Sequence, residues 1–333
     1  MAQVVVPVLL ALDIGSKKHH VAWECGDRCG REVVENTPSA MRRLFSRLIE
    51  RFGELRIVME ATGVYFFDAA LMATELGAQV MVVNPKTSHN FAKALAQRNK
   101  TDKLDALMLL EFLKRMPFRA WVVPSQAGLE IRHYGRYLLR LVEESTAAKN
   151  RLHALQSGPS PRALRVDLKR SISSLDKRID RLRTEAVTLI ASDPDLKPRF
   201  DALLTIKGIG KNSAISLLGE LIILPPEMTS RACVSHAGLD VLVHQSGDTS
   251  KPPRISRHGN KYLRGALFMP SLSQCVHDPH VRAFKQTLLD RGKKKMQAQV
   301  AIMRKTLTVA WALFRNPGVY DGNKLYNTNI TTT

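Results

Sequence analysis

Two apolar stretches of this 333-residue chain end in a carboxylate, and this feature constrains the fold more than any other. Residues 4–14 form a β-branched run with Asp13 near its end, and residues 55–60 form a second run that ends at Glu60. Such runs are typical of strands buried in a sheet. A carboxylate in that setting is costly unless its charge is compensated. The two runs therefore predict neighbouring core strands that bring Asp13 and Glu60 to one edge of a sheet.

The rest of the first third alternates between strand and helix patterns. A hairpin is expected around the Gly26-Asp27 turn, and Pro38 opens a helix. This order predicts an α/β domain with a mixed sheet. The further predicted strands lie at residues 20–24, 31–35 and 79–83, and the predicted helices at residues 38–51, 65–76 and 88–96.

Residues 98–106 read Arg-Asn-Lys-Thr-Asp-Lys-Leu-Asp-Ala and predict a helix that Thr101 caps. Asp102 and Asp105 then lie three residues apart on one face of its first turn. Taken alone, both are explained by the helix dipole, which favours acidic residues at this end. Together with Asp13 and Glu60, they form four carboxylates that repel one another unless a cation lies between them. Because oxygen ligands suit Mg²⁺, the sequence predicts a magnesium site for phosphodiester chemistry.

The charge of the chain is unevenly distributed. The net charge is +20, and residues 1–115 contribute +3 while the remainder contributes +17. A basic excess of this size favours a nucleic-acid partner. Aromatic residues make up only 6% of the chain, so phosphate contacts are expected to dominate over base stacking.

The four cysteines, Cys25, Cys29, Cys233 and Cys275, lack the paired spacing of a zinc site, and free thiols are expected. The N-terminus does not have the order of a signal peptide, and the apolar runs are too short to span a bilayer. These features predict a cytoplasmic protein with no membrane partner.

A heptad pattern begins at Ile131 and continues to Leu155, and a similar one covers residues 164–182. Between them, residues 157–161 form a Gly/Pro turn, so an antiparallel coiled-coil hairpin is predicted. Its length suits a dimerisation arm or a nucleic-acid clamp, and a structural spacer is the alternative. The predicted domains are a catalytic domain at 1–125, the hairpin at 126–192, a mostly helical domain at 193–318 and a disordered tail at 319–333.

Two segments of the mostly helical domain are candidates for nucleic-acid contacts. Gly208-Ile209-Gly210 between two amphipathic helices is similar to the turn of a helix-hairpin-helix module, where backbone N–H groups approach a phosphate. The segment 238–260 reads as a polar loop rich in serine, threonine and basic residues. The candidate contact residues are Lys207, Gly208, Gly210, Lys211, Lys251, Arg254, Arg257, Lys261, Arg264, Lys293, Lys294 and Lys295.

Several of these motifs, in this order, resemble one protein family along nearly the whole chain. The resemblance is to the DEDD transposases of insertion-sequence family 110, including its 1111 subgroup, whose catalytic domain is RuvC-like (RNase H-like). The matching motifs of the first half are Leu12-Asp13-Ile14-Gly15, Met59-Glu60-Ala61-Thr62-Gly63, Val83-Asn84-Pro85 and Arg98-Asn99-Lys100-Thr101-Asp102-x-x-Asp105. Those of the second half are Ile206-x-Gly208-Ile209-Gly210, Ala237-Gly238-Leu239, Ser246-Gly247 and Leu263-Arg264-x-Ala266-Leu267-x-Met269-Pro270.

The resemblance implies a specific reaction. Members of the family recombine circularised elements at specific sites, guided by a structured RNA, the bridge RNA, that pairs with donor and target DNA. A serine of the C-terminal domain attacks the phosphodiester and becomes linked to DNA, and it maps onto Ser246. The acidic tetrad Asp13, Glu60, Asp102 and Asp105 holds Mg²⁺. Composite active sites in the family imply a homo-oligomer, a dimer of dimers. The expected location is the bacterial cytoplasm, in association with the nucleoid.

Other interpretations remain open at this point. A metal-dependent nuclease such as a Holliday-junction resolvase would use water and need no serine. A non-catalytic DNA- or RNA-binding protein with a decayed catalytic domain is a third class, and the intact tetrad argues against it. The loop around Ser246 has fewer hydroxyls than some relatives and contains Pro252-Pro253, so Ser250 and Ser256 are the alternative nucleophiles.

Overall fold

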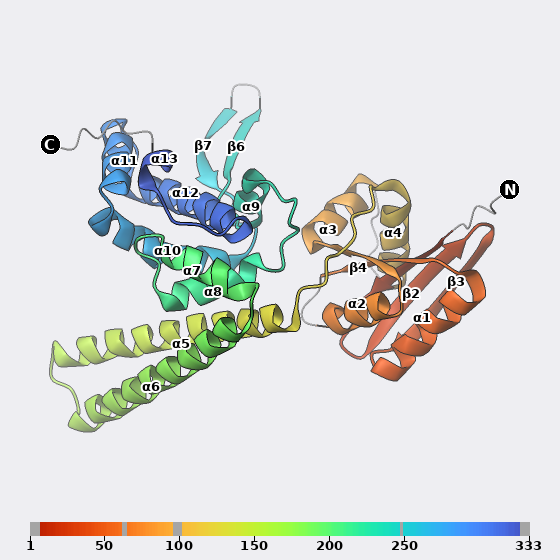
Figure 1. Ribbon diagram of the computed structural model, residues 1–333, viewed down its shortest axis with the longest axis horizontal. Coiled ribbons are helices and arrows are strands. Elements are labelled where there is room, and N and C mark those ends of the chain that lie inside the picture. The colour runs from red at the N-terminus through yellow and green to blue at the C-terminus, as the bar shows by residue number, and fades with distance from the viewer. Residues whose placement is uncertain (1–6, 62–64, 96–101, 247–248, 327–333) are drawn as a thin grey trace. The chain divides into compact units, whose positions relative to one another are not determined.

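The computed structural model describes residues 7–61, 65–95, 102–246 and 249–326 (Figure 1). Within these ranges the side chains of residues 102, 103, 243–246, 249–253 and 325 lie outside the description. The chain forms two compact units, Met1–Val123 and Pro124–Thr333. Within the described ranges, we find no helix with both the length and the apolar character that a membrane span requires.

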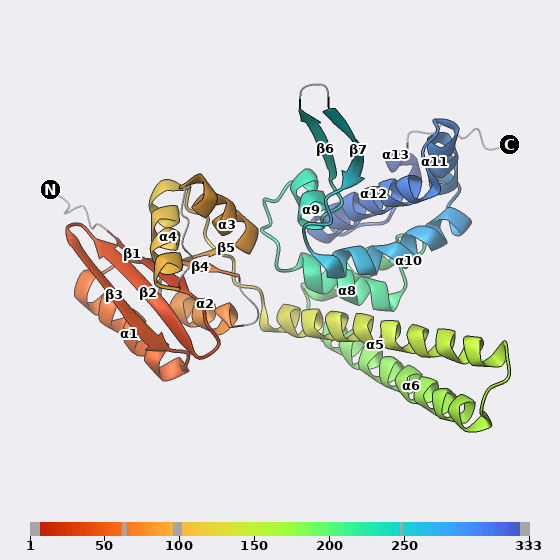
Figure 2. The same ribbon diagram turned by 180° about the vertical axis from the view of Figure 1, so that it is seen from behind.

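The first unit is built on a five-stranded mixed sheet with the strand order β3-β2-β1-β4-β5 (Figure 2). The pairs β1–β2 and β2–β3 are antiparallel, whereas β1–β4 and β4–β5 are parallel. This mixed topology is compatible with an RNase H-like domain. The strands are β1 (Val8–Asp13), β2 (Lys18–Cys25), β3 (Arg28–Glu35), β4 (Leu55–Glu60) and β5 (Gln79–Val83).

Helices pack on the two faces of this sheet. Alternate residues of β1 and β4, including Leu12 and Met59, pack with α1 (Pro38–Phe52) and α2 (Phe66–Glu75). The intervening residues, including Ala11 and Val58, pack with α4 (Asp102–Arg115). Apolar residues on both faces of these strands explain why the sequence reads as continuous runs.

The predicted strands at 55–60 and 79–83 are confirmed to the residue, and the predicted helix at 38–51 is confirmed within one residue. The helix predicted at 88–96 begins earlier, because α3 covers Pro85–Ala94. Its N-cap is Asn84, whose side chain accepts a hydrogen bond from the backbone N–H of Lys86. An Asn-Pro pair is a strong helix start, since it supplies both the cap and a fixed φ at the first position.

The second unit begins with two long helices, α5 (Gln126–Gln156) and α6 (Arg162–Ser192), which lie antiparallel as a helical hairpin (Figures 1 and 2). The predicted pair of helices and the turn between them are confirmed. Leu138 and Leu141 of α5 are buried in one core with Ile179 of α6. A polar contact also joins the two helices: the Ser145 hydroxyl of α5 donates a hydrogen bond of 2.7 Å to Asp176 Oδ1 of α6.

The N-terminal part of α5 packs against the remaining helices of the unit, which we call the body. Here α5 and α8 approach so closely that a Cβ at Gly135 would lie 2.8 Å from Ser216 Cα, and a Cβ at Gly219 would lie 2.5 Å from Arg132 Cα. The core of the body is apolar and includes Leu217, Leu263 and Trp311. Its helices are α7 (Leu196–Leu204), α8 (Lys211–Leu221), α9 (Ser230–His236), α10 (Lys261–His277), α11 (Pro279–Asp290), α12 (Lys295–Arg315) and α13 (Gly322–Leu325).

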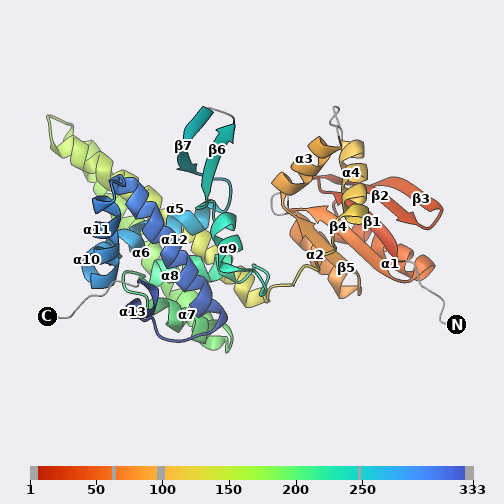
Figure 3. The same cartoon turned by 90° about the horizontal axis from the view of Figure 1, so that it is seen from above.

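The prediction of an irregular loop over residues 238–260 is wrong for most of that segment. The chain forms a two-stranded antiparallel hairpin of β6 (Val241–Ser246) and β7 (Thr249–Ile255), which projects from the body beside α9 (Figures 1 and 3). Pro252-Pro253 and the polar composition masked it, because prolines are typical of loops. They are tolerated in β7, where one edge has no strand to pair with in the described sheet.

The prediction of a disordered tail is wrong as far as Tyr326. Tyr326 is only 2% exposed and packs with Val281 and Ile302. The hydroxyl of Tyr320 donates a hydrogen bond of 2.8 Å to Asp278 Oδ2. These two aromatic residues hold the segment against the body although its composition is polar. Residues 327–333 of the predicted tail lie outside the described residues.

Candidate active site and nucleic-acid interface

Asp13 and Glu60 end two adjacent parallel strands. The register pairs Leu12 with Met59, so the next residue of each strand is the acidic one. Side chains alternate along a strand, and Ala11 and Val58, two positions earlier, both pack on the α4 face. Because of this alternation, Asp13 and Glu60 belong to the same face, at the carboxyl ends of β1 and β4. Both side chains are half-buried. The prediction that Asp13 and Glu60 end neighbouring core strands is confirmed.

The first turn of α4 contributes the next carboxylate. Ala106 of this turn is buried in the cluster that contains Ala11 and Val58, and Asp105, which precedes it, is half-buried. Asp102 is the first residue of α4, but its side chain lies outside the described residues, as does Thr101. Among the side chains that the structure describes, no three His, Cys, Asp or Glu groups lie close enough to hold one metal ion. The oxygen donors at this edge nevertheless have the chemistry that a hard divalent cation requires.

A serine that the sequence did not indicate holds Glu60. Ser88, in the first turns of α3, is 1% exposed, and its hydroxyl lies 2.6 Å from Glu60 Oε2. A second residue that we did not predict, His20 of β2, is the cross-strand partner of Asp13 and shares its face. Ser88 follows the Asn84 cap by four residues, and this position near a helix start gives no sign of its contact with Glu60, 28 residues away.

Ser246 is the last residue of β6. Its backbone pairs with Thr249, so it lies at the tip of the β6–β7 hairpin, while its side chain is outside the described residues. Of the alternative nucleophiles, Ser250 lies in β7 opposite Gln245. Ser256 lies at the root instead, where its hydroxyl donates a hydrogen bond to Asp240 Oδ1. Ser246 thus lies at the tip of the hairpin, whereas Ser256 lies at its root and is hydrogen-bonded there.

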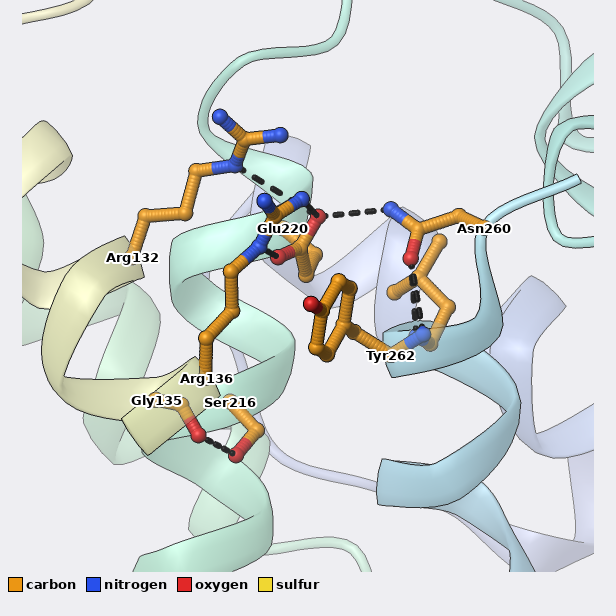
Figure 4. A network of polar contacts seen from close by, with 8 residues as sticks. Arg132, Gly135, Arg136, Ser216, Glu220, Asn260 and Tyr262 are labelled. Atoms are coloured by element: carbon orange, nitrogen blue, oxygen red, sulfur yellow. Dashed lines mark hydrogen bonds and ion pairs between the residues drawn. The ribbon is translucent and has the colours of Figure 1, made fainter. Parts of the chain in front are cut away.

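A buried ionic network lies at the root of this hairpin (Figure 4). Glu220 of α8 is 1% exposed and receives hydrogen bonds from Arg136 of α5 and from the Asn260 amide, the latter at 2.6 Å. Arg132 Nε lies 3.5 Å from the same carboxylate. Asn260 also caps α10, because its side chain accepts from the N–H groups of Tyr262 and Leu263. One carboxylate therefore ties α5, α8 and the end of the hairpin segment together.

The charge state of this network follows from opposing effects. Burial disfavours the ionised form of Glu220, but the hydrogen bond from Arg136 and the charges of Arg132 and Arg136 outweigh it and hold the pKa of Glu220 below its usual value. Arg136 also stacks on the Tyr262 ring, 4.2 Å from its centroid. His236 lies nearby, and burial lowers its pKa. The network is thus an ionised carboxylate between two arginines.

The predicted nucleic-acid contacts fall into three described groups. Gly208 adopts a φ of 84° in the turn before α8, where Gly210 is the N-cap, and Lys207 and Lys211 are exposed beside it. The second group lies at the hairpin root, and the third, residues 293–295, is exposed at the start of α12. The side chain of Lys251 is outside the described residues.

The residues of the second group differ in whether their side chains are exposed for contact with a nucleic acid. Arg254 and Lys261 are exposed, and Arg257 is exposed with a left-handed φ of 52°. Arg264 instead donates hydrogen bonds to the backbone carbonyls of Ala237 and Gly259, so it braces the hairpin root.

Two family models match the chain. The model of DEDD transposases of the IS110 type, described as a transposase, matches residues 10–158. A model described as a transposase of the IS116/IS110/IS902 family matches residues 201–286. The first match contains the four carboxylates and the second contains the β6–β7 hairpin.

Named relatives agree with these matches. The pilin gene-inverting protein of Moraxella bovis is 31% identical over 273 residues, which cover 80% of this chain and 82% of that protein. The probable family 20 transposase of Pseudomonas aeruginosa is 25% identical, over 79% of this chain and 85% of that protein. An uncharacterised 43.6 kDa protein of insertion element IS110 from Streptomyces coelicolor is 22% identical, over 95% of this chain and 96% of that protein. With both halves matched in order, the chain belongs to the IS110 family of transposases, enzymes that recombine DNA.

Proposed function

We propose that this transposase is an RNA-guided, site-specific recombinase that cuts and rejoins DNA through a covalent phosphoserine. The observation that carries the proposal is the distribution of the candidate catalytic residues over the two units. One unit has carboxylates at the carboxyl ends of β1 and β4 and at the start of α4, and the other has Ser246 at a hairpin tip.

The carboxylate edge supplies the electrostatic part of the reaction. Asp13, Glu60, Asp102 and Asp105 would hold Mg²⁺, which, when bound, stabilises the charge that develops on the phosphodiester oxygens. The chain's own contribution is to fix these oxygens in place. Two are anchored at the ends of buried strands, and Ser88 holds Glu60 by a hydrogen bond. A site built on rigid strands keeps its geometry as DNA enters.

Ser246 supplies the covalent part. Attack of its hydroxyl oxygen on phosphorus forms a serine phosphodiester and expels a DNA hydroxyl, which takes up a proton. Reversal with a different DNA hydroxyl rejoins a strand and needs no external energy source, because the phosphodiester bond is conserved. Lys251 and Arg254, which follow in β7, supply positive charge for the phosphate.

The partners in this proposal are donor DNA, target DNA and a structured guide RNA. The net charge of +17 beyond residue 115 suits these polyanions. The α5–α6 hairpin acts as the coiled-coil arm of a homo-oligomer, a dimer of dimers, and the α7–α8 turn acts as a helix-hairpin-helix phosphate contact. We assign residues 1–125 to catalysis, 126–192 to the arm and 193–318 to the serine-bearing domain, with the enzyme at the nucleoid.

The experiment is a search for the covalent adduct. Purified protein is incubated with labelled element-end DNA, the element's RNA and Mg²⁺, and denaturing electrophoresis separates protein-linked DNA. Ser246→Ala should abolish the adduct, whereas Ser256→Ala, which removes the hydroxyl at the hairpin root, should retain it. An adduct with Ser246→Ala would place the nucleophile elsewhere, with Ser250 next in line. Cleavage without any adduct would instead support a resolvase-like nuclease that uses water.

A further inference from the structure

A cavity of about 730 Å³ opens in the second unit between α9, the start of β6, α11 and α12. Its lining is mixed in character. Arg231, Arg304 and Lys305 are basic, Val241 and Phe284 are apolar, and the remainder includes several hydroxyl side chains. This volume is within the range of pockets that bind small organic ligands, about 300–1,000 Å³. The cavity belongs to the second unit, whereas the carboxylate edge belongs to the first.

Two arginines of this lining, Arg231 and Arg304, have no acidic partner among the described side chains. The acidic side chain in the lining, Asp240, accepts a hydrogen bond from Ser256. Three cations and one anion leave the lining with a positive excess, which favours an anionic ligand.

The third cation lies in aromatic surroundings. Lys305 Nζ is 4.4 Å from the centroid of the Phe284 ring and 4.6 Å from that of Tyr326. Burial lowers the pKa of Lys305, which means that its positive charge is incompletely solvated. An anion bound nearby would offset that cost. Of these two rings, that of Phe284 lines the cavity and gives it a flat apolar wall next to its charges.

A ligand that is anionic at one end and flat and apolar at the other fits these walls. We propose that the cavity binds one nucleotide unit of a nucleic-acid strand, with its phosphate on Arg231 and Arg304 and its sugar or base against Val241 and Phe284. Val241 is the first residue of β6, and Ser246 is the last. A strand held at this root is therefore positioned along the hairpin that carries the serine.

The proposal rests on the nucleic-acid partners proposed above and does not depend on the serine mechanism. Its test is binding alone, without metal ions. Fluorescence anisotropy is measured with labelled single-stranded DNA, duplex DNA and RNA of one sequence, between about 50 and 200 mM salt. The variant is Arg231→Gln/Arg304→Gln. The matched control is Arg140→Gln/Arg181→Gln, which removes the same charge from arginines paired with Glu144 and Glu185 on the helical arm.

We expect the pocket variant to weaken binding of at least one probe about tenfold and to reduce the log–log salt slope for that probe by about one per lost phosphate contact, with the control unchanged. An effect on RNA alone assigns the pocket to the guide, and an effect on DNA alone assigns it to a substrate strand. Slopes that are unchanged with every probe, or changed equally by the control, overturn the proposal.

A second measurement uses the unaltered chain and so does not depend on the folding of a variant. Strands that carry 4-thiothymidine or 4-thiouridine are photocrosslinked to the protein, and the linked peptides are identified by mass spectrometry. Crosslinks to the peptides that contain Val241 or Phe284 support the pocket. Crosslinks confined to other parts of the chain refute it. Ser246→Ala should crosslink at the same peptides, which separates this result from the fate of the proposed nucleophile.

Discussion

The hydroxyl of Ser88 lies 2.6 Å from Glu60 Oε2 and 2.9 Å from the backbone carbonyl of Pro85. A serine has a single O–H to donate, and the shorter contact to a charged acceptor is the stronger one. Ser88 therefore donates to Glu60. Because Ser88 belongs to α3, the orientation of a carboxylate at the end of β4 is fixed by the helix that follows β5.

Ser88→Ala should slow strand cleavage about tenfold, equivalent to about 1.4 kcal/mol in the barrier, because Glu60 loses its fixed orientation. The free energy of unfolding should fall by only about 1 kcal/mol. Single-turnover cleavage and urea denaturation measure the two effects. The control is Thr74→Val, which removes a hydroxyl that donates to the Ala70 carbonyl within α2. If Ser88→Ala cleaves at the wild-type rate, the contact has no positioning role.

Asp13→Ala, Glu60→Ala, Asp102→Ala and Asp105→Ala should each abolish cleavage and leave RNA binding intact. Their stability without metal should be unchanged or higher, since removing one of several like charges relieves repulsion. A chelator should likewise stop the wild-type enzyme. Asp68→Asn, a carboxylate in the first turn of α2, serves as control and should cleave normally. Full recombination by any two tetrad variants in Mg²⁺ would refute the assignment.

Mixing Ser246→Ala with Asp102→Ala should restore part of the cleavage that each variant lacks. In a mixed oligomer, one protomer's serine can meet another's intact carboxylates. Cleavage is measured over a range of mixing ratios, and co-assembly is verified with two affinity tags. If co-assembled variants never complement at any ratio, the site is completed within a single chain.

RNA should copurify with the protein, and its binding should weaken steeply with salt because each neutralised phosphate releases counterions. For a chain with a net charge of +17 beyond residue 115, the log–log slope should correspond to several phosphate contacts. Filter binding at several salt concentrations gives this slope. A slope near zero, or recombination by a preparation free of RNA, would contradict RNA guidance.

Glu220→Gln should lower the free energy of unfolding by about 3 kcal/mol at neutral pH, because it leaves Arg132 and Arg136 without their buried counter-ion. The folded-state pKa of Glu220 is depressed, so its contribution is fully present above the ordinary value of 4.5 and is lost as the pH falls through the folded pKa. Denaturation at several pH values should show the two proteins converging in acid. Glu144→Gln, in an exposed pair with Arg140, should change stability by less than about 1 kcal/mol.

The sequence predicts secondary structure most accurately where the local residue pattern favours the same element as the tertiary packing does. Strand β4 and strand β5 were located to the residue because apolar runs of core length are bounded by turn residues. The same pattern placed Asp13 and Glu60 at strand ends, and parallel pairing makes these two ends neighbours in the sheet.

Elements that depend on distant contacts were missed. The β6–β7 hairpin is polar and contains Pro252-Pro253, so no local pattern distinguished it from a loop. The segment around Tyr326 packs against the body through Tyr326, which contacts α11 and α12, and through Tyr320, which donates a hydrogen bond to Asp278. Ser88 and Glu220 gain their importance from partners 28 and 40 or more residues away, which no spacing rule indicates.

Helix α5 runs without a break from the body, where Gly135 lies against α8, to the arm, where Leu141 and Ala148 are buried along α5. On the α5 side, the junction between body and arm is therefore a point along a helix and not a loop. Since each residue turns an α-helix by about 100°, one residue inserted at that point would rotate the whole arm about its axis. Relatives whose arms differ in length should therefore differ by numbers of residues close to whole helical turns. Chimaeras that combine the arm of one relative with the body of another should function only when the rotation of the arm about the α5 axis is kept.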